Sequence, residues 1–126
     1  MAEVDEVRGL FGCLIDGRQR PCRFPVKARQ LEAPDEHGVY VIIRRCSGTV
    51  AHVGRTCRGK TGLRGRLRRH VQGNSSFVKT CLHGNRNVLP RDYEFRYLVV
   101  KKARLRALLE YYAIGRLCPR HLGLGI

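Results

Sequence analysis

The sequence has few acidic residues, and most of them lie near its start. Lysine and arginine number 25, aspartate and glutamate 10, which gives a formal charge of +15. After Glu36 the acids are Asp92, Glu94 and Glu110. Because a compact chain with such a surplus repels itself unless a polyanion compensates the charge, the composition favours a protein that binds nucleic acid.

Signals for zinc binding, export and membrane insertion are also missing. The six cysteines include no CxxC pair, and Cys81 with His83 has no second pair at ligand spacing, which argues against a zinc site. No segment has the layout of a signal peptide, and no apolar run is long enough to cross a membrane. We therefore expect reduced, mostly buried thiols in an intracellular protein of the cytoplasm, nucleoid or nucleus, without a membrane partner.

The basic residues are concentrated in the middle of the chain. Residues 37–91 contain no acid and twelve arginines or lysines. A solvated basic face is the ordinary interpretation of a basic run, but this length without compensating acids favours a nucleic-acid footprint. The predicted phosphate contacts are Arg55, Arg58, Lys60, Arg64, Arg68 and Arg69.

Hydrophobic periodicity predicts an N-terminal extension, residues 1–36, with a short helix and a basic loop, followed by an α/β (α+β) domain, residues 37–126. The order β-β-α-(α)-β-α favours a small three-stranded antiparallel or mixed sheet flanked by helices. Within the second part we expect strands at 38–44, 49–54 and 93–100, helices at 63–72, 75–82 and 101–117, and a loop at 83–92.

Polar side chains interrupt these elements at a few positions. Tyr40 falls in the centre of the first strand and His52 in the second, where each alone is usually a structural residue. Arg66 and His70 are four residues apart, so their side chains share one helix face at the rim of the core. An arginine beside a histidine suits the binding and protonation of a phosphate oxygen.

Glu110 is a carboxylate inside the most apolar predicted helix. By helical spacing it shares a face with Ala107, Ile114 and Leu117, which is the expected packing side. Burying a carboxylate is unfavourable unless a cation or hydrogen-bond donors compensate it. Glu110 is therefore either half of an ion pair or the anchor for one metal ion.

The tripeptides GVY (residues 38–40) and HVG (residues 52–54) resemble the pair of motifs that names the GIY-YIG nucleases. LRGRLRRH resembles the helix signature of this family through Arg66 and His70, and EYYAIGRLCPRHLG resembles its closing signature. The resemblance extends over about residues 37–124 and implies the fold of the family. Four motifs in order are far more specific than any one of them.

The resemblance also implies roles for these residues. Glu110 would bind one divalent ion, Mg²⁺ or alternatively Mn²⁺, and Tyr40 would position or deprotonate the attacking water. Arg66 would stabilise charge on the phosphate, and His70 would assist proton transfer or hold the base. His52 stands where the family usually has tyrosine, so it is a substitute general base or a sign of lost activity.

The closing signature also differs from the family pattern, because His121 stands where asparagine is usual and would have a supporting role at the metal site. The resemblance implies a metal-dependent endonuclease that hydrolyses phosphodiester bonds in DNA by a one-metal mechanism, as a nicking or a structure- or sequence-specific enzyme. The alternative is a catalytically impaired domain that only binds nucleic acid. Targeting would come from the extension, the loop at 83–91, a homodimer or a separate partner.

Overall fold

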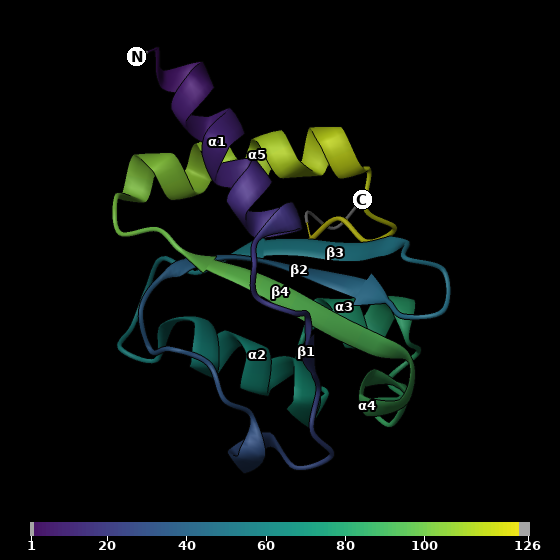
Figure 1. Cartoon of the computed structure of the whole chain (residues 1–126). Coiled ribbons are helices and arrows are strands. Elements are labelled where there is room, and N and C mark those ends of the chain that lie inside the picture. Colours follow the sequence, from purple (N-terminus) through teal and green to yellow (C-terminus); the bar gives the residue numbers. More distant parts are fainter. Residues whose placement is uncertain (1, 124–126) are drawn as a thin grey trace.

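Four strands form one antiparallel sheet in the order β1-β4-β2-β3 (Figure 1). The computed structural model describes residues 2–123. The three predicted strands are present, and β1 is an additional strand at the edge that the sequence analysis missed, because two residues carry no periodicity. The strands are β1 (Cys22–Arg23), β2 (Gly38–Arg44), β3 (Val50–Arg55) and β4 (Tyr93–Val99).

Helices cover both faces of the sheet. The helices α1 and α5 lie on one face, and α2, α3 and α4 lie on the other (Figure 1). The prediction of a loop throughout 83–92 is wrong, because α4 lies within it. This helix is only five residues long, contains Pro90 in its first turn and buries Leu89, so it shows no amphipathic pattern. The helices are α1 (Glu3–Asp16), α2 (Gly62–Gln72), α3 (Ser76–Cys81), α4 (Val88–Asp92) and α5 (Ala103–Leu117), with a 3-10 turn η1 (Ala28–Gln30).

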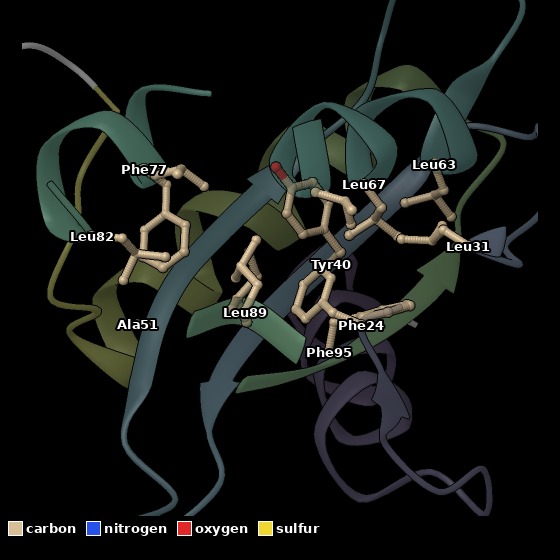
Figure 2. Close-up of a cluster of buried hydrophobic side chains, with 13 residues drawn as sticks. Phe24, Leu31, Tyr40, Ala51, Leu63, Leu67, Phe77, Leu82, Leu89 and Phe95 are labelled. Carbon is tan, nitrogen blue, oxygen red and sulfur yellow. The ribbon is translucent and has the colours of Figure 1, made fainter. Parts of the chain in front are cut away.

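The central strand β2 contributes to two hydrophobic cores. Tyr40 and Ile42 belong to the core under α2 and α3, whereas Val39 and Val41 belong to the core under α1 and α5. Successive strand residues point to opposite faces, so a largely buried apolar run is what a sheet covered on both sides requires. All of the side chains labelled in Figure 2 belong to the first of these cores.

The N-terminal helix α1 packs against α5 through its buried residues Val7 and Leu14. The guanidinium of Arg104 on α5 donates to both oxygens of Glu3, at 2.8 and 3.0 Å. These groups are exposed, so the ion pair adds little beyond the apolar contact. The short helix predicted in residues 1–36 is present, and the division of the chain at residue 37 stays a prediction.

The six cysteines are free in the structure, which describes all of them. The prediction of mostly buried thiols is wrong, because four of the six lie on the outer side of helix α1, in turns or at a helix end, where no packing covers them. Within residues 2–123, no helix is both long and apolar enough to cross a membrane. The exposed cysteines are Cys13, Cys46, Cys57 and Cys118.

Candidate active site

Tyr40 is fully buried, and its hydroxyl reaches the edge of the core beside α2 (Figure 2). Its partner across the sheet is Gly54 on β3, and paired residues point to the same face. A Cβ atom at position 54 would collide with the Tyr40 hydroxyl. The glycine of the HVG tripeptide therefore provides the space that the tyrosine side chain occupies.

His70 on α2 forms a hydrogen bond with the Tyr40 hydroxyl. The distance from Tyr40 Oη to His70 Nε2 is 2.8 Å, and His70 Nδ1 lies 2.7 Å from Ser75 Oγ. Helix α2 ends at Gln72 and is capped by Gly73, whose positive φ of 80° turns the chain back. Ser75 then begins α3 by accepting a hydrogen bond from Val78 N, so the tight connection between the helices also orients the imidazole.

His52 lies on the other side of the Tyr40 hydroxyl and is only 8% exposed. Its Nε2 lies 3.5 Å from Tyr40 Oη, and its Nδ1 lies 3.0 Å from His121 Nδ1. A bulge in β3 precedes this contact, since Ile42 pairs with His52 and Ile43 with Val50. Bulges commonly redirect a side chain beside an active site.

His121 reaches this position because the chain after α5 runs along β3. Arg120 N donates to Val50 O at 3.3 Å and His121 N donates to Ala51 O at 2.9 Å, and His52 and His121 form a parallel bridge. The imidazole of His121 therefore contacts that of His52. The supporting role at a metal site that the sequence suggested stays a prediction.

The contacts form a chain from His121 through His52, Tyr40 and His70 to Ser75. In a contact between two Nδ1 atoms one imidazole must donate and the other accept. If Tyr40 donates to His70, its oxygen is free to accept from His52, whose Nδ1 then accepts from His121. If every bond is reversed, the Nε2 atom of His52 accepts from Tyr40, so the tautomer of one histidine constrains the others.

Burial keeps these groups neutral at pH 7. It raises the pKa of Tyr40 to about 12, an effect that the nearby Arg66 opposes. Burial, together with the neighbouring His121, lowers the pKa of His52 to about 4. The pKa of His70 lies well below its usual value for the same reason, with further repulsion from His52 and Arg66. The neutral Tyr40 hydroxyl therefore lies between two uncharged imidazoles.

Glu110 lies beside this cluster and contacts Arg55. Arg55 Nε is 3.6 Å from Glu110 Oε1, and the glutamate side chain is 16% exposed. Burial raises the pKa of Glu110, and Arg55 opposes the shift. The deepest face of α5 is formed by Arg106, Leu109 and Ala113, so Glu110 lies at the edge of the packing face. Its side chain is largely buried and faces Arg55 on β3, so it lies on the packing side as expected, but at its edge.

These side chains line a common cleft of about 540 Å³. It brings together the predicted catalytic residues of β2, β3, α2 and α5 with two of the predicted phosphate contacts, Arg55 and Arg69. The cleft also contains Tyr111 and Ser75, which the sequence did not indicate, although Ser75 precedes a helix as a typical cap. The cleft is lined by Tyr40, His52, Val53, Gly54, Arg55, Arg66, Arg69, His70, Asn74, Ser75, Ser76, Glu110, Tyr111, Ile114, Leu122 and Gly123.

The other predicted phosphate contacts lie away from this cleft. Arg58 and Lys60 are exposed in the connection between β3 and α2. Arg64 lies 3.6 Å from the carboxylate of Asp35, and Arg68 donates to the carbonyl of Arg29 at 3.2 Å. These two arginines of α2 thus contact the segment before β2, which leaves fewer free donors for phosphate than the sequence suggested.

The donor set of the cleft suits an ion that keeps most of its water. Within residues 2–123 no cluster of three or more His, Cys, Asp or Glu could hold a metal. Among the described residues that line the cleft, Glu110 is the one carboxylate. Mg²⁺ commonly binds one or two carboxylates together with waters and substrate phosphates, so a single half-buried glutamate fits such an ion.

Comparison with protein-family models and with curated protein sequences finds no match for this chain. Among solved structures, two similar ones are variants of the GIY-YIG N-terminal endonuclease domain of UvrC from Thermotoga maritima. An asparagine-to-alanine variant bound to its catalytic divalent cation has a TM-score of 0.52 and 23% identity, covering 74% of this chain and 91% of the other. A tyrosine-to-phenylalanine variant, also bound to the cation, has a TM-score of 0.51 and 19% identity, covering 92% and 93%.

Proposed function

From the GIY-YIG fold that the chain has, we propose that it is a divalent-metal-dependent endonuclease that hydrolyses phosphodiester bonds in DNA. The observation that supports the proposal most is the convergence of Tyr40, Arg66, His70 and Glu110 in one cleft. They come from three separate parts of the chain, and each matches a motif of the family. The similar solved domains are endonuclease domains that carry a divalent cation.

Glu110 would hold one divalent ion, Mg²⁺ or alternatively Mn²⁺. When bound, such an ion neutralises charge on the scissile phosphate and acts as a Lewis acid. Arg55 already contacts the carboxylate, so it balances the negative charge of Glu110 when no ion is bound. Arg66 and Arg69, both exposed on α2 and at the cleft, would bind phosphate oxygens.

Tyr40 and His52 would have different roles toward the attacking water. At pH 7 a phenol with a pKa of about 12 is ionised in about one molecule in 100,000. The imidazole of His52, with a pKa of about 4, is almost entirely in its proton-accepting form. We therefore assign orientation of the water to Tyr40. His52, whose Nε2 atom faces the Tyr40 hydroxyl, would accept the proton through this hydroxyl, in place of the usual tyrosine. His70 would hold the Tyr40 hydroxyl.

A second candidate is a domain that binds nucleic acid without cleaving it. The contact between Arg55 and Glu110 favours this alternative, since it satisfies the carboxylate without a metal ion. In both cases phosphate contacts from arginine would make binding weaken steeply with salt. Targeting by a second copy of the chain or by a separate partner would fit either candidate.

A plasmid-nicking assay separates the two candidates. We expect nicking by the wild type with Mg²⁺, and none with EDTA or after Glu110→Gln, which keeps the shape of the side chain but removes its charge. Glu32→Gln removes an exposed acid on the segment before β2 and is the matched control, which should cleave normally. Cleavage by Glu110→Gln would refute the role of the carboxylate, and DNA binding without any cleavage by the wild type would establish the second candidate.

A further inference from the structure

Tyr111 is an exposed aromatic residue at the entrance of the catalytic cleft. It follows Glu110 on α5, lines the cleft and is 61% exposed. Exposed tyrosines are common on protein surfaces and usually need no special explanation. This one lies directly beside the proposed metal ligand, in the lining of the same cleft.

The guanidinium of Arg55 packs on the ring of Tyr111. The guanidinium carbon of Arg55 lies 5.1 Å from the centroid of the ring, and its Nη2 lies 3.5 Å from the Tyr111 hydroxyl. An aromatic ring supported in this way loses little conformational freedom when a second flat group packs on it. The arginine also contacts Glu110, so the orientation of the ring is tied to the catalytic carboxylate.

The cleft beside Tyr111 has an apolar wall as well as a basic one. Ile114, one turn along α5, and Leu122, which is 37% exposed, line the same cleft as Arg66 and Arg69. The phosphates and sugars on the outside of a paired duplex offer little flat apolar surface for such a wall. An unstacked nucleobase offers a flat face to the ring and an attached phosphate to the arginines.

A purely local role for Tyr111 would be to hold Arg55 against Glu110. That role requires the contact between the ring and the guanidinium, but it does not require the ring to be largely exposed or to share the cleft with Ile114 and Leu122. The combination of an open ring, an apolar wall and flanking arginines matches a site for one nucleotide with its phosphate.

We propose that Tyr111 stacks on an unpaired nucleobase next to the bond that is cut, so that the substrate is DNA with a locally unpaired nucleotide. This inference rests on the proposed function for the position of the cleavable phosphate. Base pairs in intact duplex DNA stack on their neighbours, and releasing a base from the stack is unfavourable unless the pair is already disrupted. A bulge, a mismatch or a single-stranded end supplies such a base.

The test measures binding without cleavage, in EDTA, so it does not depend on activity. Three duplexes are compared: one fully paired, one with a single bulged nucleotide, and one with an abasic bulge that keeps the backbone and its flexibility but lacks the base. The wild type is expected to bind the base-containing bulge about tenfold more tightly than the abasic one. Tyr111→Phe should retain this ratio, and Tyr111→Ala should reduce it to about one.

Each outcome of these measurements either supports or overturns the stacking role of Tyr111. A wild-type ratio near one, or a ratio that Tyr111→Ala leaves intact, overturns the stacking role while nicking of any DNA would still support the endonuclease. Cross-linking of a bulged 5-iodouracil to Tyr111, located by mass spectrometry, provides a second measurement, and a cross-link elsewhere would contradict the proposal. Failure to bind all three duplexes would overturn both the inference and the proposed function.

Discussion

Acid should destabilise this fold through His52. The imidazole is neutral in the folded protein down to a pKa of about 4, because burial and His121 disfavour its charged form. In the unfolded chain its pKa is about 6.5. Between these two values the unfolded state binds more protons than the folded state, so the stability contributed by a neutral His52 is fully present above about pH 6.5 and is lost as the pH falls.

The size of the effect at pH 5 follows from these two values. Relative to its value at high pH, the equilibrium constant for unfolding increases by a factor of (1 + 10^1.5)/(1 + 10^−1), about 30. The corresponding loss of stability, RT ln 30, is about 2 kcal/mol. This loss is a large part of the total stability of a small domain, about 5–15 kcal/mol. His70 contributes in the same direction, because its pKa is also depressed.

Urea unfolding followed by circular dichroism at pH 7.5 and pH 5.0, at constant ionic strength, measures this loss. Comparing the two pH values within each protein removes any change that a substitution makes at neutral pH. His52→Gln should lose about 2 kcal/mol less than the wild type on acidification. His83→Asn, at an exposed position with a positive φ that asparagine tolerates, is the control and should behave as the wild type. Equal losses in His52→Gln and the wild type would refute the reasoning.

Three other substitutions test separate features of the structure. Gly54→Ala should destabilise the fold by about 1–3 kcal/mol in urea unfolding and slow nicking, because the new methyl group displaces the Tyr40 hydroxyl. Gly9→Ala should stabilise it by about 0.5–1 kcal/mol, raising Tm, since position 9 lies inside α1 and the described atoms leave room for a methyl group; a lower Tm would contradict this. Arg66→Lys should reduce the nicking rate about tenfold or more with nearly unchanged DNA affinity, because an ammonium cannot form the paired hydrogen bonds of a guanidinium; an unchanged rate would exclude a role for the guanidinium fork.

The sequence predicted the elements that have strong local patterns. The run GVYVIIR is β-branched and apolar, and it forms β2. The buried stripe of Leu63, Leu67 and Val71 defines α2. Such patterns depend on neighbours within a few residues, so they can be recognised without a structure.

Contacts between distant residues could not be predicted in this way. His52 and His121 are 69 residues apart and meet only because the chain after α5 runs along β3. The contact of Arg55 with Glu110 depends in the same way on the packing of α5 beside β3. From the sequence Arg55 was predicted to bind phosphate, because the sequence shows its charge but not its contact with Glu110.

Because β2 supplies side chains to both cores, neither layer of helices can separate from the sheet without exposing one side of this strand. Local opening of one layer alone would leave Val39 and Val41, or Tyr40 and Ile42, in water. Local unfolding is rare where such burial is shared. The amide hydrogens of β2 should therefore exchange with solvent only when the whole domain unfolds. In that case the two layers fold and unfold as one cooperative unit, and the Tyr40 hydroxyl keeps its position for as long as the molecule is folded.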